Sequence, residues 1–306
     1  MRAAALFLAA AVMMGATLPL GRTLRLAGAP ALPLLAAAFA IAGLTLLVLT
    51  VRREHGQLTA PRTWRFAAVA ALLGMTLPHT IAFSALSTLG AAAVALGYAL
   101  PPAFTYLLAR LTGMESGRPV RLAATALALA GGLVLAWPSD TSVESAWLAK
   151  TAVLLLLPFS LAAGNLYRKR FMPPRASSAL LAGVTLTAAA VELTLTTLAS
   201  GASFTGPWLT NPAFAALVIA TGIGFVFYFA AQKRIDVTLF SQIGNLMAIT
   251  AALVAWVLLG EAPPLAMAPA VPLIAAGAWL LARYPAHRAN ANARERRDAY
   301  LDPESG

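Results

Sequence analysis

The sequence lacks cysteine and has few charged residues for its length. Of its 306 residues, 11% are charged and 60% are hydrophobic. The lack of cysteine excludes disulfide bonds and cysteine-ligated metals. Soluble domains contain about 25% charged and about 45–50% apolar residues, so a water-soluble core could not bury this much apolar surface. The composition therefore predicts an integral membrane protein rather than a large soluble helical one.

Motifs of common catalytic sites are also missing. The sequence has no Gly-x-Ser-x-Gly nucleophile motif and no P-loop, and its three histidines are scattered. These residues offer no metal-ligand spacing. We therefore expect no metal, no cofactor, no ATP coupling and no enzyme activity.

Ten apolar segments predict an all-α membrane protein with ten transmembrane helices. Each has roughly the 17–25 residues that a helix needs to cross a bilayer core of ~30 Å, and lipid offers no partner to free backbone groups. The first could be taken for a signal peptide, but it matches the sixth in its glycine and in the basic residues that follow, so we expect it to be retained. The segments are 3–20, 31–51, 66–86, 88–109, 119–137, 147–167, 177–199, 211–231, 237–259 and 265–283.

The distribution of basic residues predicts the topology. With a cytoplasmic N-terminus, 19 Lys and Arg residues fall on the inner side, and only Arg22, Arg25 and Lys150 fall outside. By the positive-inside rule, both termini are cytoplasmic in a bacterial-type plasma (inner) membrane. This placement accounts for the net charge of +11, so we expect no nucleic-acid partner. It also leaves no Arg or Lys at the expected midplane to hold a phosphate.

The chain repeats itself at an offset of 146 residues. Glu115 and Glu261 end two similar stretches, and Gly131 falls on Gly277 at the same offset. Each repeat has five predicted spans, an odd number, so the second repeat enters the membrane from the opposite side. Inverted repeats are typical of transporters, whose substrate site lies at the repeat interface.

The domain boundaries follow from this repeat. We predict a first five-helix repeat over residues 1–140 and a second, inverted one over residues 145–283. Residues 284–306 are polar and aperiodic, which predicts a disordered cytoplasmic tail.

The chain resembles the drug/metabolite transporter superfamily, specifically the EamA-type permeases. The resemblance covers about residues 3–283 and rests on the 5+5 layout, on Leu-Leu-Gly-Glu at 258–261 and on its degenerate copy at 112–115. It implies transport of small organic solutes, often export of amino acids or related metabolites. It also implies a cavity lined by the first, third, fourth, sixth, eighth and ninth spans. Glu115 and Glu261 would then be structural, binding loop amides or a helix N-terminus.

Four polar residues on the ninth span form the first candidate site. Thr238, Ser241, Gln242 and Asn245 follow i, i+3, i+4 and i+7 spacing and share one helical face. Their amides could bind a zwitterion or a hydroxyl group. Hydrogen bonding between helices is the alternative. Asn245 lies deepest and is the main substrate-binding candidate.

Two ionisable residues fall within predicted spans. His79 follows Pro78, which should kink the helix and free the carbonyl of Gly74, so His79 could line the cavity or couple protons. Glu192 is the only acid well inside a span and is a second candidate for proton coupling. The alternatives for Glu192 are a hydrogen bond to a neighbouring helix and a side chain that snorkels outward, and the alternative for His79 is a packing role.

Two tyrosines complete the candidates for substrate binding. Tyr98 lies just before Pro101-Pro102 in the fourth span, and Tyr228 lies in the eighth. Asn165 and Gln232 fall near inner helix ends, where we expect them to cap or hydrogen-bond helices. The expected partners are a small-molecule solute and the lipid bilayer, with a monomer and a homodimer both open. Broad drug efflux, a membrane-embedded enzyme acting on lipid-linked substrates and an assembly protein are the alternatives.

Overall fold

The computed structural model describes residues 3–82, 97–136, 155–260 and 262–286. All secondary structure in these ranges is helical. The elements are α1 (Ala3–Leu26), α2 (Ala31–Leu58), α3 (Pro61–Ala71), the π-helix η1 (Leu72–Thr76), α5 (Pro101–Leu111), α6 (Pro119–Ala136), α8 (Leu156–Phe171), α9 (Ser178–Ala199), the 3-10 helix η2 (Pro207–Thr210), α10 (Pro212–Gln232), α11 (Val237–Ser241), α12 (Ile243–Leu259) and α13 (Met267–Arg283).

Several of these helices are long and apolar enough to cross a membrane. Within the described ranges there are six, and α6 and α13 are shorter apolar helices. This confirms the prediction of an α-helical membrane protein. The six are Ala3–Leu26, Ala31–Leu58, Pro61–Ala82, Ser178–Ala199, Pro212–Gln232 and Val237–Leu259. The total of ten remains a prediction, because residues 83–96 and 137–154 lie outside the description.

Short polar side chains fix where three helices of the second half begin. Ser177 accepts a hydrogen bond from the backbone N–H of Leu180 and begins α9. Asn211 and Asp236 cap α10 and α11 in the same way. Each cap satisfies an N–H that the first helical turn leaves without a partner. At the other end of α12, Gly260 adopts the left-handed conformation (φ 69°) that commonly terminates a helix.

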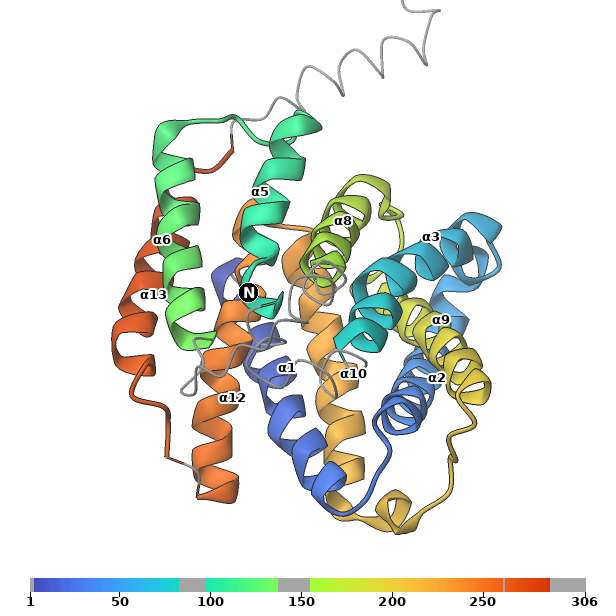
Figure 1. The fold of residues 1–306 in the computed structure, drawn as a ribbon. Helices are drawn as coiled ribbons and strands as arrows, with labels where there is room; N and C mark the ends of the chain where they lie inside the picture. The colour runs from blue at the N-terminus through green and yellow to red at the C-terminus, as the bar shows by residue number, and fades with distance from the viewer. Residues whose placement is uncertain (1–2, 83–96, 137–154, 261, 287–306) are drawn as a thin grey trace, which may run out of the picture.

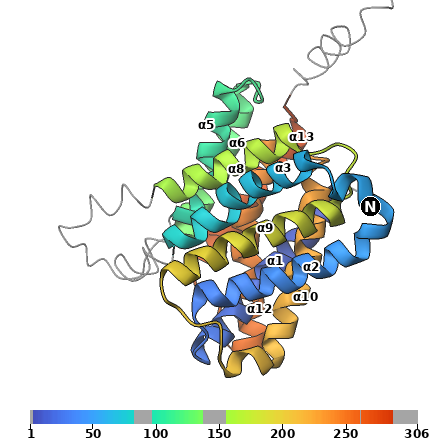
Figure 2. The ribbon, with the colours of Figure 1, turned by 90° about the vertical axis from the view of Figure 1, so that its right-hand side faces the viewer.

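The helices pack in pairs that join the two halves of the chain. In Figure 1, α6 and α13 lie along one side of the molecule and α2 and α9 along the other, with α1, α10 and α12 between them. Figure 2 views the molecule from the side of α2 and α9. α1 packs on α10 and α12, while its counterpart α8 packs on η1, α3 and α5. Corresponding helices therefore have corresponding neighbours.

Two glycines matched by the sequence repeat make reciprocal contacts. A Cβ on Gly131 would lie 2.9 Å from the carbonyl of Ala270 and 2.8 Å from Ile274, and a Cβ on Gly277 would lie 2.6 Å from the carbonyl of Ala124. Ala124 and Ala270 are themselves 146 residues apart. Such reciprocity is the mark of a twofold relation. It lets α6 and α13 approach at van der Waals distance, as small residues do in membrane helix pairs.

Two of the predicted spans are irregular in the structure. The ninth is broken at Gln242 into α11 and α12. In the third, Pro78 was expected to kink the helix, but the backbone widens into the π-helix η1 just before it. A wider turn relieves the clash between a proline ring and the carbonyl four residues earlier.

Candidate functional site

Glu115 lies at the centre of a buried ionic cluster at the end of the molecule where α5 and α6 meet. One carboxylate oxygen accepts from Arg121 Nε (2.6 Å) and from the backbone N–H of Ser116 (2.9 Å). The other accepts from Arg121 Nη2 (2.7 Å) and Thr238 Oγ1 (2.6 Å). Charge-assisted, two-pronged pairs of this kind are strong and directional. Glu261, the repeat partner of Glu115, lies outside the described residues.

The same cluster connects the two halves of the chain. Arg121 Nη2 also donates to Asp236 Oδ1 (2.9 Å), and Nη1 donates to the carbonyls of Leu281 (3.3 Å) and Tyr284 (2.6 Å). Asp236 is the N-cap of α11, and Leu281 belongs to α13. One guanidinium therefore holds the loop before α6, the start of α11 and the end of α13 together.

The surroundings of Glu115 favour its charged form. Burial raises the pKa of the carboxyl group, but hydrogen bonds from Arg121 and Thr238 and the positive charge of Arg121 lower it by more. The pKa of Glu115 therefore lies below its ordinary value of 4.5. A charged Glu115 keeps the guanidinium of Arg121 paired, which a buried cation requires.

A second polar cluster surrounds Arg168 in the last turn of α8. Its side chain is only 3% exposed. Nη2 donates to Asn165 Oδ1 (2.8 Å) and to the hydroxyl of Tyr228 (2.7 Å), and Nη1 donates to the carbonyl of Ala70 (3.2 Å). The guanidinium also lies 5.4 Å from the centre of the Tyr228 ring, within cation–π range. Tyr228, predicted to bind substrate, is thus a neighbour of a buried cation.

Two buried polar atoms in this cluster have no hydrogen-bond partner among the residues that the structure describes. They are Nε of Arg168 and Oε1 of Gln232. Gln232 is joined to the cluster through Nε2, which lies 3.4 Å from the carbonyl of Asn165. Buried polar groups nearly always form hydrogen bonds in native structures. Two unpaired polar atoms in one cluster are therefore unusual.

The π-helix η1 supplies the surface on which Arg168 rests. Ser160 Oγ donates to the carbonyl of Leu73 (2.7 Å), and Arg168 binds the carbonyl of Ala70. Two side chains of α8 thus satisfy backbone groups in and just before η1. A Cβ on Gly74 would overlap Nη1 of Arg168. Gly74 therefore provides the space that the guanidinium occupies.

The two candidates for proton coupling contact adjacent residues around η1. Glu192 Oε2 accepts from Thr76 Oγ1 (2.5 Å), the last residue of η1. Nδ1 of His79 lies 2.5 Å from the carbonyl of Met75, and its ring meets Phe39 edge-on at 6.2 Å. Both side chains are partly buried. The structure therefore brings His79 and Glu192 to one irregular helical segment.

The polar face of the predicted ninth span is turned into the protein. Thr238, Ser241, Gln242 and Asn245 are all buried. Thr238 binds Glu115, and Ser241 binds the carbonyl of Thr238. Asn245 Nδ2 donates to Gln242 Oε1 (3.0 Å) and to the carbonyl of Ala128 (3.3 Å). Nε2 of Gln242 is buried and has no hydrogen-bond partner among the described residues.

Tyr98 lies where the two halves of the chain meet. Its side chain is 36% exposed, and its backbone carbonyl would lie 3.8 Å from a Cβ on Gly244. Tyr98 and Gly244 are 146 residues apart. Positions related by a twofold axis touch each other only close to that axis, so Tyr98 lies near the centre of the pseudosymmetric bundle.

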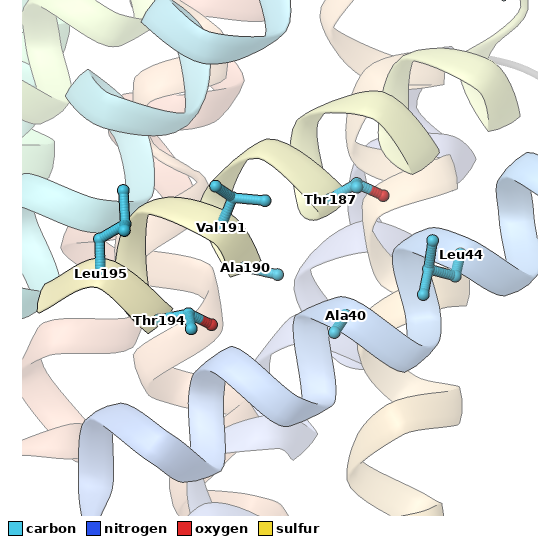
Figure 3. A pocket seen from close by; sticks show the side chains of 7 residues that line it. All are labelled: Ala40, Leu44, Thr187, Ala190, Val191, Thr194 and Leu195. Atoms are coloured by element: carbon cyan, nitrogen blue, oxygen red, sulfur yellow. The ribbon is translucent and has the colours of Figure 1, made fainter. Parts of the chain in front are cut away.

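An open groove between α2 and α9 lies away from these clusters. Figure 3 shows its lining, which is apolar apart from the hydroxyl groups of Thr187 and Thr194. Leu44, Val191 and Leu195 are each more than half exposed there. An open apolar groove on a membrane helix pair faces lipid tails, so we assign it no role in solute binding.

Sequence reasoning missed Arg168 and Arg121, which it counted only as topological charges. Both side chains are buried and bind groups from the other half of the chain. Long side chains of a helix point toward its N-terminus, so Arg168 reaches back over Gly164 and Asn165. A small residue and an amide in the preceding turn are the signal that could have indicated burial.

These features define a class of protein, and comparison with known proteins gives the family. The class is an α-helical membrane protein whose two halves pack through a pseudo-twofold relation, with polar clusters at their junction. The EamA-like transporter family matches residues 1–137 and again residues 149–283. The chain therefore belongs to the EamA-like transporter family, within the drug/metabolite transporter superfamily. It is a membrane transporter of small solutes by that membership.

The other two comparisons differ in what they find. The search of curated proteins finds no match. Several solved structures match, and one of them, a crystal structure of a protein, is similar over 97% of this chain and 99% of its own, with a TM-score of 0.75 and 24% sequence identity. At 24% identity the similarity supports the fold of this chain and nothing about its function.

Proposed function

We propose that the protein is a secondary transporter that moves small organic metabolites by alternating access. The proposed solutes are apolar or zwitterionic, with export of amino acids or related compounds as the main activity. The observation that carries this proposal is the reciprocal packing of α6 and α13 around Gly131 and Gly277. Two repeats related by such packing can rock about the site between them.

The proposal extends to the membrane arrangement. Ten helices form two inverted five-helix repeats in a bacterial-type inner membrane, with both termini in the cytoplasm. In that orientation the Glu115 cluster ties the cytoplasmic ends together. Lys169 adds bonds to the carbonyls of Gln232 (2.8 Å) and Ile235 (2.5 Å). We take the bonds of the Glu115 cluster to support a state closed toward the cytoplasm, because they join the two repeats, whereas these bonds of Lys169 lie within the second repeat.

Flux measurements on reconstituted protein test the transport proposal. Proteoliposomes would be screened with radiolabelled amino acids and with cationic dyes, because broad drug efflux is the alternative. We expect saturable flux of amino acids, lost in Tyr98→Ala and Asn245→Ala proteins that still fold. Trp279→Ala, an aromatic residue of α13 that is 63% exposed, is the control. Unchanged flux in both site variants would remove the proposed site, and flux of dyes alone would favour drug efflux.

We propose that His79 or Glu192 couples transport to protons, because both side chains are ionisable and both contact η1, an irregular segment of a predicted span. An imposed pH gradient should then accelerate flux in the wild type. In the Glu192→Gln or His79→Gln protein this acceleration should disappear, while solute exchange without a gradient continues. Equal acceleration in the wild type and in both variants would show that neither residue couples protons.

A further inference from the structure

We propose that Arg168 is an anion-recognition residue that takes the carboxylate of a small solute. The inference rests on the proposed transport function and adds the charge that a transported solute carries. It starts from a guanidinium that is enclosed by protein and 3% exposed. An arginine cannot shed its charge, so the surroundings must accommodate a permanent cation.

The partners of Arg168 form hydrogen bonds to its guanidinium but carry no negative charge to balance it. Its hydrogen-bond acceptors are a backbone carbonyl, an amide oxygen and a phenol, on Ala70, Asn165 and Tyr228. Within the described parts of the chain, no carboxylate forms a salt bridge with it. Arg121, the other buried arginine, binds two carboxylates. A buried cation without an acid is costly, and the Arg168 cluster is therefore one negative charge short.

The guanidinium also has donors to spare. Arginine offers five N–H groups, whereas Arg168 makes three hydrogen bonds to the described part of the chain. One unused donor is Nε, which is buried and has no partner within residues 3–82, 97–136, 155–260 and 262–286. A carboxylate oxygen at Nε would supply both the missing bond and the missing charge.

The position of the cluster fits a path between the two halves. Arg168 comes from α8, Tyr228 from α10 and Ala70 from α3. The guanidinium lies beside Gly164, which is four residues before Arg168. At 1.5 Å per residue, it therefore reaches about 6 Å deeper into the bundle than its own backbone. A charge that lies inside the junction becomes reachable when the two halves move apart.

The cluster favours a carboxylate over a phosphate. The ammonium group of the neighbouring Lys169 donates to the carbonyls of Gln232 and Ile235. It therefore does not add a second positive charge at the guanidinium of Arg168. A single guanidinium balances the one charge of a carboxylate but only part of the charge of a phosphate. The orphan Oε1 of Gln232 would accept a hydrogen bond from an ammonium group, which suits a zwitterion.

Thermal unfolding of the purified, detergent-solubilised protein tests this site with simple carboxylate probes. The probes are benzoate, its neutral isostere benzamide, and inorganic phosphate, each titrated against wild type, Arg168→Lys, Arg168→Gln and Arg170→Gln. Arg170 is exposed on the same helix, so its loss removes the same charge outside the cluster. We expect benzoate to raise the unfolding temperature saturably, with a smaller effect of benzamide and phosphate.

The variants separate recognition from a purely structural role. Arg170→Gln should bind benzoate like the wild type. Arg168→Lys keeps the charge but loses the planar fork, so its benzoate affinity should fall about tenfold or more, as expected when a hydrogen bond between charged groups is lost. Arg168→Gln should lose the benzoate response. If Arg168→Gln fails to fold, the comparison rests on the lysine variant.

Two results would overturn the proposal. One is equal stabilisation of the wild type by benzoate and benzamide. The other is an unchanged benzoate affinity in a folded Arg168→Lys or Arg168→Gln protein. Proteoliposome flux keeps the two proposals apart. Equal flux of neutral solutes through the wild type and Arg168→Gln would show that the variant still transports. A missing benzoate response in that variant would then report on the anion site alone. Benzoate binding without flux of any solute would leave the site and contradict the transport proposal.

Discussion

Two buried arginines at the junction of the halves differ in how their charge is compensated. Arg121 is held by the carboxylates of Glu115 and Asp236, whereas Arg168 is held, in the described part of the chain, only by neutral oxygen atoms. Removing one partner of a buried ion pair leaves an uncompensated charge. The Glu115 cluster is therefore where a single substitution should cost most stability.

Glu115→Gln should destabilise the folded protein at neutral pH. The amide keeps one acceptor for Arg121 but removes the charge, so we expect a loss of about 3 kcal/mol, the low end for breaking a buried pair. Glu54→Gln is the control, because Glu54 is only partly buried and accepts a bond from the backbone of Ser177. Thermal unfolding in detergent measures the difference. A smaller effect for Glu115→Gln than for Glu54→Gln would contradict the structural role.

The pH dependence of the same pair gives a second prediction. The pKa of Glu115 is lowered on folding, so its contribution to stability is complete above the unfolded value of 4.5 and is lost as the pH falls through the folded pKa. On acidification the unfolding temperature of the wild type should approach that of Glu115→Gln. A gap that stays constant down to about pH 3, below the usual carboxyl pKa range, would show that Glu115 does not titrate as inferred.

Among the elements, the pair α6 and α13 depends on small residues for its close approach. A Cβ on Gly277 would lie 2.6 Å from both the carbonyl of Ala124 and the Cβ of Ala128. Both of these atoms are rigid parts of α6, so the helices would have to separate. The irregular segment η1 shows the same dependence, since Gly74 leaves the space for Arg168.

Gly277→Ala should therefore weaken the packing of α6 on α13. We expect a loss of about 1–3 kcal/mol, as for other overpacked cores. The matched control is Gly21→Ala in α1, where a Cβ would meet no atom within 4 Å. There the change should be neutral or stabilising by up to about 1 kcal/mol, because alanine is the better helix former. Equal unfolding temperatures for the two variants would mean that the helices can separate at no cost.

At the scale of the whole molecule, the natural absence of cysteine makes the topology directly measurable. Arg175 and Thr205 are exposed and lie in loops on opposite sides of the predicted membrane. Single cysteines at these positions would be treated with a membrane-impermeant maleimide. In intact cells we expect labelling of Thr205→Cys and not of Arg175→Cys, with the reverse in inside-out vesicles. Labelling in the opposite pattern would contradict the cytoplasmic termini.

The sequence by itself determined the class, the family and the internal repeat of this protein. Hydropathy over about 20 residues is a local property, because every membrane helix must satisfy its own backbone and match the bilayer thickness. The 146-residue offset is also visible without a structure, and it places Gly131 and Gly277 at equivalent positions. The structure then shows these two glycines at one interface.

Only the tertiary structure decided what the polar side chains contact. The burial of Arg168 depends on groups that other helices provide, namely the carbonyl of Ala70 and the space beside Gly74. The break at Gln242 and the π-helix before Pro78 are changes of backbone geometry that hydropathy does not report. The same arginine could lie at the lipid surface or turn into the bundle, and its sequence position is compatible with both. The space beside Gly74 and the oxygens of Asn165 and Tyr228 favour the buried position, because burying a guanidinium is costly unless hydrogen-bond acceptors surround it.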